Sequence, residues 1–158
     1  MRPVVLGMAS LLLGTTAAYA GSVDGSSALA LAALVAEQSP IVKATDKTLL
    51  AKFLNGGANA PYASKDKITV AADAVSCKSS NVDITIHDCD LTFGTKKITT
   101  HGRRAHELYA TLAEAGVPSD GAAGSIFEAV SNLNCTIDPA AVMEKAGGGA
   151  HCTYDPAK

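Results

Sequence analysis

The chain has 158 residues, of which 47% are hydrophobic and 18% charged, and its formal net charge is −2. It is too apolar and too weakly charged for a disordered protein, and its length suits a single domain. Lys96-Lys97 and Arg103-Arg104 are the nearest approach to a basic patch, and four charges near a helix start are typical of a solvated face. The composition therefore argues against a nucleic-acid-binding surface.

Residues 1–20 have the pattern of a secretory signal peptide. Arg2 supplies a positive charge, Val4 to Leu13 forms an apolar run, and Ala18-Tyr19-Ala20 matches an A-x-A cleavage site. The apolar run is shorter than the roughly 20 residues that cross a bilayer, and Gly21 stands where a lipid anchor would need a cysteine. We expect cleavage after Ala20 and a periplasmic or secreted protein with no membrane span. The short signal favours the bacterial periplasm, and eukaryotic secretion stays open.

All four cysteines lie after this segment, at Cys77, Cys89, Cys135 and Cys152. An even number of cysteines in an exported chain predicts disulfides, and four cysteines allow three connectivities. We favour Cys77–Cys89 and Cys135–Cys152, because pairing between neighbours closes the shortest loops. No C-x-x-C spacing indicates a zinc ribbon, and a catalytic thiol would leave unpaired cysteines in an oxidising compartment.

The first elements in chain order are helical. Residues 21–44 are expected to form a mobile Gly/Ser-rich leader and a short helix, Ala28 to Glu37, which ends before Ser39-Pro40. A second helix is predicted from Thr45 or Asp46 to about Asn55, where Gly56-Gly57 stops it.

A strand-rich block follows between residues 68 and 100. Its apolar alternation shifts phase after Ala72, which predicts a bulge near Asp73. Gly94-Thr95 is a candidate hairpin turn. The best helix of the chain is predicted over 102–115, followed by a strand over 125–137, a helical turn capped by Asp138, and a last strand over 150–154.

A shift of 58 positions aligns parts of the chain with one another. It places Leu50 on Leu108 and Cys77 on Cys135, so that each part runs from a helix through a strand to two cysteines. This pattern predicts a single compact domain over 45–158, with related halves 45–101 and 102–158. The expected core comprises Leu50, Phe53, Leu54, Ile68, Val70, Ile84, Ile86, Leu108, Leu112, Ile126 and Phe127.

The strongest candidate chemistry is the run His87-Asp88-Cys89-Asp90, with His151 before Cys152. His87 and His151 are metal-ligand types, and Asp88, Asp90 and His87 are acid–base types. Against both hypotheses, strand alternation places His87 on the opposite face from the two carboxylates.

The spacing of residues in the sequence gives less support to other kinds of catalytic or metal site. His101 and His106 are separated by about 140° on a helix and do not converge; we expect His101 near the helix start and His106 exposed beside Glu107. No G-x-S-x-G elbow or phosphate-binding loop is present. Asp83, Asp88, Asp90 and Glu128 have no spacing that indicates paired carboxylates for glycoside cleavage.

These observations predict an exported α+β protein with two disulfides, in which an antiparallel sheet of four to six strands packs against two or three helices. Its plan is similar to that of secreted inhibitor modules built as tandem repeats, although no family motif is present. We expect a non-catalytic binding or inhibitory module for another envelope or secreted protein, without a cofactor and without assigned catalytic or metal residues. An exposed apolar patch within 78–86 or 139–149 would favour it. The alternatives are a small periplasmic hydrolase and a metal-binding envelope protein that uses His87 and His151.

Overall fold

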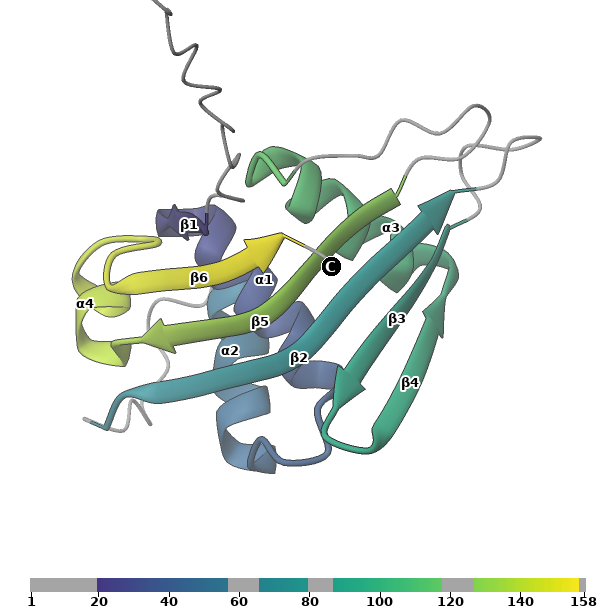
Figure 1. Ribbon diagram of the computed structural model, residues 1–158. Coiled ribbons are helices and arrows are strands. Elements are labelled where there is room, and N and C mark those ends of the chain that lie inside the picture. Colours follow the sequence, from purple (N-terminus) through teal and green to yellow (C-terminus); the bar gives the residue numbers. More distant parts are fainter. Residues whose placement is uncertain (1–19, 57–65, 80–86, 118–126, 157–158) are drawn as a thin grey trace, which may run out of the picture.

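The computed structural model describes residues 20–56, 66–79, 87–117 and 127–156. They form one six-stranded antiparallel sheet with helices packed on one of its two faces (Figure 1). The predicted α+β class, with an antiparallel sheet and two disulfides, is confirmed. No helix within the described ranges is long and apolar enough to span a membrane.

The sheet has the order β1-β6-β5-β2-β3-β4, so the chain places its first strand beside its last. All neighbouring strands are antiparallel. The strands are β1 (Gly21–Asp24), β2 (Ile68–Ser79), β3 (His87–Phe93), β4 (Lys96–His101), β5 (Phe127–Ile137) and β6 (Ala150–Pro156).

The helices are α1 (Gly25–Gln38), α2 (Ala44–Leu54), α3 (Gly102–Glu114) and the short α4 (Pro139–Glu144). Figure 1 shows α1, α2 and α3 behind the sheet, whereas α4 lies at one end, in the connection from β5 to β6. As predicted, Asp138 caps α4: its side chain accepts hydrogen bonds from the backbone N–H groups of Ala140 and Ala141.

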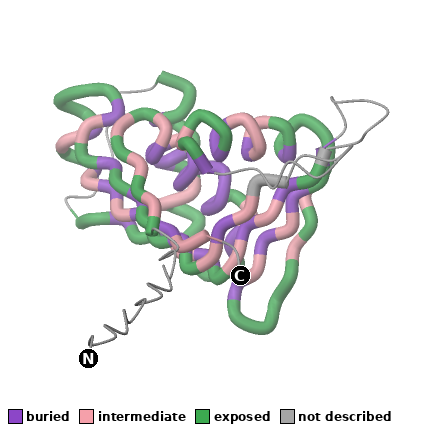
Figure 2. The backbone as a smooth tube through the Cα atoms, turned by 45° about the horizontal axis from the view of Figure 1, so that its top comes forward, coloured by how far each residue is buried: buried purple, intermediate pink, exposed green. Residues whose placement is uncertain are grey.

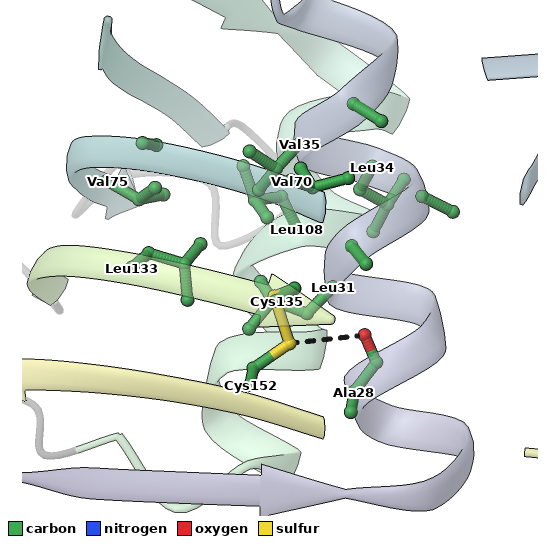
Figure 3. Close-up of a cluster of buried hydrophobic side chains, with 14 of the residues drawn as sticks. Ala28, Leu31, Leu34, Val35, Val70, Val75, Leu108, Leu133, Cys135 and Cys152 are labelled. Atoms are coloured by element: carbon green, nitrogen blue, oxygen red, sulfur yellow. Dashed lines mark hydrogen bonds between the residues drawn. A yellow bond between two sulfur atoms is a disulfide. The ribbon is translucent and has the colours of Figure 1, made fainter. Parts of the chain in front are cut away.

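Helix α1 supplies much of the core, which lies between the helices and the sheet (Figures 2 and 3). Its sequence is a run of alanine and leucine, so small side chains bring the helix close to the strands while Leu31 and Val35 fill the space between them. Eight of its residues are buried: Ala28, Leu29, Leu31, Ala32, Ala33, Leu34, Val35 and Ala36.

The helix expected over Ala28 to Glu37 forms as α1, whereas the Gly/Ser-rich leader before it differs from the expectation. Gly21–Asp24 is strand β1, and it pairs with β6 at the other end of the chain. The Gly/Ser composition of this segment gave no indication of strand, because its order comes from a distant partner. Gly21 lies so close to the Tyr154 ring that a Cβ there would overlap a ring carbon.

Most of the expected core is buried where its side chains are described. Leu50, Phe53, Ile68, Val70, Leu108 and Leu112 are buried, whereas Leu54 is 39% exposed because it ends α2 at the surface. Ile84, Ile86, Ile126 and the side chain of Phe127 lie outside the described residues.

Both disulfides form as predicted, Cys77–Cys89 and Cys135–Cys152. In each pair the two cysteines face one another directly on neighbouring strands, with Cα atoms 4.0 Å apart. All four side chains are fully buried against the helices. Each disulfide therefore joins the two strands of one hairpin beneath a helix.

The fold contains an approximate internal two-fold symmetry that relates β1-α1-β2-β3 to β4-α3-β5-β6. The sheet order is symmetric under this exchange, which swaps β1 with β4, β6 with β3 and β5 with β2. Gly25 and Gly102 open α1 and α3 with φ values of 72° and 62°. The carbonyl oxygens of Ala28 and Ala105 contact the sulfur atoms of Cys152 and Cys89 at 3.4 and 3.3 Å.

The offset of 58 agrees with this symmetry for β2 and β5 but not for the helices. The offset aligned the helix over 46–55 with α3, whereas α1 occupies the equivalent place in the fold. The cause is α2, which interrupts the connection from α1 to β2 and has no counterpart between α3 and β5 among the described residues. The symmetric units begin at β1 and β4, so they differ from the halves 45–101 and 102–158.

The phase shift expected near Asp73 is present, although β2 itself keeps its register. Buried positions change from Val70 and Ala72 to Val75 and Cys77, while β2 pairs with β3 and β5 without a slip. The register shift lies instead between β5 and β6, at Ser131 to Asn134. The Asp73 carboxylate accepts a hydrogen bond from the backbone N–H of Gly94.

Candidate binding face

The face of the sheet that points away from α1, α2 and α3 is covered by no described helix (Figures 1 and 2). We call it the open face. Strand alternation places cysteines and aliphatic residues toward the helices and short polar residues on this side. Its exposed and half-buried residues include Ser22, Asp24, Thr69, Ala71, Ser76, Lys78, Asp88, Asp90, Thr92, Lys97, Thr99, His101, Asn134, Thr136, His151 and Thr153.

A histidine–aspartate pair lies on the open face at the β3–β4 hairpin. His101 Nδ1 lies 2.6 Å from an Asp88 carboxylate oxygen, and both side chains are more than half exposed. The two residues are direct cross-strand neighbours. The pair therefore combines an oriented imidazole with a carboxylate at the solvent-accessible edge of the sheet.

The next cross-strand row of this hairpin holds a second carboxylate. Asp90 accepts a hydrogen bond from Thr99 Oγ1 at 2.6 Å and an ion-paired one from Lys97 Nζ at 2.8 Å. The Lys97 ammonium first, and then the Thr99 hydroxyl, hold the pKa of Asp90 below its usual range. Asp88 and Asp90 share one strand face, as the alternation predicted, but each is paired with β4 and not with the other.

A second histidine–aspartate pair lies at the opposite edge of the sheet. His151 Nδ1 lies 2.6 Å from an Asp24 carboxylate oxygen, and these residues are cross-strand neighbours on β6 and β1. The internal two-fold symmetry relates the two pairs to one another. The histidine of each pair occupies the position that the aspartate has in the other pair. Asp88 and His151 each precede the second cysteine of a disulfide, and His101 and Asp24 each precede the glycine that opens a helix.

The histidines that the sequence offered as a metal site do not meet. His151 is exposed on the open face, whereas His87 is 2% exposed and points toward α3 on the other side of the sheet. Strands β5 and β2 also separate β6 from β3. In the described part of the chain, no group of three or more His, Cys, Asp or Glu side chains has a metal-binding arrangement.

The side chains of the acid–base hypothesis do not converge either, because His87 lies on one face of the sheet and the carboxylates of Asp88 and Asp90 lie on the other. Asp83 and the side chain of Glu128 lie outside the described residues. His101 does stand at the N-cap position of α3, but its side chain makes no capping bond and pairs with Asp88 instead. His106 is exposed, and its Nδ1 faces His87.

Sequence reasoning missed both histidine–aspartate pairs. The Asp88–His101 pair could have been predicted, because counting outward from the Gly94-Thr95 turn places Asp88 opposite His101. The second had no local signal, since Asp24 and His151 are 127 positions apart.

A hollow of about 610 Å³ lies away from these pairs. It is an open groove between α1, α2 and α3, lined by Ala30, Leu34, Leu54, Asn55, Arg103, Arg104, His106, Glu107, Ala110 and Thr111. Arg103 and Arg104 both pair with Glu107 at 2.8 and 2.7 Å, and Arg104 also reaches Glu37 at 3.2 Å. The groove therefore has balanced charges along its rim.

The apolar patch that would favour a binding module is small where it is described. Met143, 40% exposed, is the exposed large hydrophobic residue of the segment 139–149, and residues 80–86 lie outside the described ranges. Comparisons with family models, with curated proteins and with solved structures find no match.

Proposed function

We propose that this protein is an exported, non-catalytic binding module that engages another envelope or secreted protein through its open face. The observation that carries the proposal is a six-stranded sheet whose polar face is covered by no helix of the described residues, while both disulfides and the core lie on the other face. The disulfides and helices hold the strands in place, so that binding would order few additional groups.

The size of the face suits a protein partner. Six strands spaced by about 4.8 Å span roughly 24 Å, and a seven-residue strand is about 23 Å long. The resulting planar area of roughly 550 Å² approaches the ~800 Å² per partner of a standard interface once side-chain relief is added. The face consists mainly of threonine, serine, asparagine, histidine and charged side chains, so we expect a polar, salt-sensitive and reversible interaction.

Export is supported by the position of strand β1 in the sequence. The described structure enters strand β1 at Gly21, directly after the proposed cleavage position. Cleavage after Ala20 would make Gly21, the first residue of strand β1, the first residue of the mature chain. The Tyr154 ring of β6 occupies the space beside this glycine.

Site-specific photocrosslinking in the host of origin tests the proposal. A photoreactive amino acid is placed at Asn134, exposed on the open face, and as a matched control at Lys52, exposed on α2. We expect one protein to be crosslinked from Asn134, not from Lys52, and to be lost when Thr69→Arg is added beside it. Equal crosslinking from both positions, or none from Asn134, would refute the use of this face.

A further inference from the structure

His87 and His106 bring two imidazole nitrogens together beneath α3. His87 is the first residue of β3, and its ring packs against Tyr109 and His106 with centroid distances of 4.4 and 4.8 Å. Its Nδ1 lies 3.3 Å from the Nδ1 of His106. His87 is 98% buried, whereas His106 is exposed on the helix, so the pair joins a buried ring to the surface.

The arrangement places the two Nδ1 atoms at hydrogen-bond distance from one another. A neutral imidazole carries one N–H and one acceptor nitrogen, so a hydrogen bond between the two Nδ1 atoms holds a single proton between them. A metal ion in that place would accept both lone pairs at once. Neutral imidazole is the commonest metal-ligating side chain in proteins.

The distance between the Nδ1 atoms of His87 and His106 can be compared with the ligand spacing of known coordination geometries. Histidine nitrogens lie about 2.0–2.1 Å from a tetrahedral zinc ion, which puts two of them about 3.3 Å apart. Adjacent ligands at 90° in a square-planar copper site would lie closer, at about 2.9 Å. The 3.3 Å between the two Nδ1 atoms is close to the tetrahedral value.

We propose that His87 and His106 form a two-histidine site for Zn²⁺. No third His, Cys, Asp or Glu side chain of the described residues completes a ligand set, so two coordination positions remain for water or an external donor. His106 also lines the groove between α1, α2 and α3, which gives the ion a route from solvent. This site lies on the opposite side of the sheet from the open face and does not depend on the function proposed for that face.

The nearby charges permit the ion to bind. Arg103 and Arg104 follow the same helix, but both are ion-paired with Glu107, and Arg104 is also paired with Glu37. The pairing offsets the repulsion that two free guanidinium groups would exert on a divalent cation.

Zinc titration of the EDTA-treated mature protein tests the site. We expect calorimetry to show one Zn²⁺ per chain, and Co²⁺ to give the visible absorption of a tetrahedral complex. The variant His106→Ala replaces an exposed residue with the best helix former, so the fold should persist while zinc affinity falls at least about tenfold. His87→Gln should also lose binding, but this buried change risks misfolding.

The matched control is His101→Ala, which removes an exposed histidine on the other face and should leave zinc affinity unchanged. Zinc should also raise the Tm of the wild type and of His101→Ala, but not that of His106→Ala. The proposal is overturned if the wild type binds no zinc, or if the folded His106→Ala variant binds it as tightly as the wild type.

Discussion

Removing the disulfide between Cys135 and Cys152 should cost about 3 kcal/mol of unfolding free energy. The two cysteines are 17 positions apart, and closing a loop of that length removes about 10.5 cal/mol/K of entropy from the unfolded chain in the chain-entropy model. Replacing both buried residues by alanine also leaves space beneath α1, where the Cys152 sulfur contacts the Ala28 carbonyl. That cavity adds to the loss.

The measurement is urea unfolding of the mature protein followed by circular dichroism at 25 °C, comparing the wild type with Cys135→Ala/Cys152→Ala. The equivalent Cys77→Ala/Cys89→Ala variant closes a loop of similar length, with a separation of 12, and should lose about 3 kcal/mol as well. The quadruple variant should lose roughly 6 kcal/mol, which approaches the whole stability of a small domain. If either double variant unfolded at the wild-type urea midpoint with an unchanged slope, the reasoning from loop closure would be refuted.

Three further outcomes follow from the structure. Leu31→Ala, at a fully buried position of α1, should cost about 3–5 kcal/mol in the same urea assay, while the partly exposed control Leu54→Ala should cost less than about 1 kcal/mol; equal losses would contradict the packing of α1. Gly21→Val would overlap the tyrosine ring of β6 and should detach β1, seen as faster amide hydrogen exchange in β1 and β6; unaltered exchange would contradict this contact. Lys97→Ala should raise the pKa of Asp90 toward its ordinary value in an NMR titration. Because the folded pKa is lowered, the small stabilisation by this pair should be present at neutral pH and disappear as the pH falls through that pKa.

Local sequence signals were sufficient for the elements that depend on near neighbours. The apolar stripe of α3, the Asp138 cap of α4 and the Gly94-Thr95 turn each act within a few residues, and each stands where the pattern placed it. The disulfide pairing belongs to the same group, because loop-closure entropy favours cysteines that are close in the chain. The fold class followed from these elements together with strand alternation.

The candidate sites depended on contacts that the local pattern does not contain. Strand alternation separated His87 from Asp88, but it could not show which face the helices would cover, and so it left the burial of His87 undetermined. The pairing of His87 with His106 required the crossing of α3 over β3. In the same way, the Asp24–His151 pair required β1 to join β6.

The sequence by itself determined the helices, the hairpin, the Asp138 cap and the two cysteine pairs, because short-range hydrogen bonding and loop closure specify them. Tertiary structure alone decided that Gly21–Asp24 becomes a strand, that α1 enters the core and that no described helix covers the polar face of the sheet. Strand β1 forms by pairing across more than 100 positions, and α1 packs against elements distant in the chain. In both cases the gain comes from buried area and completed sheet hydrogen bonds rather than from the local preferences of the residues.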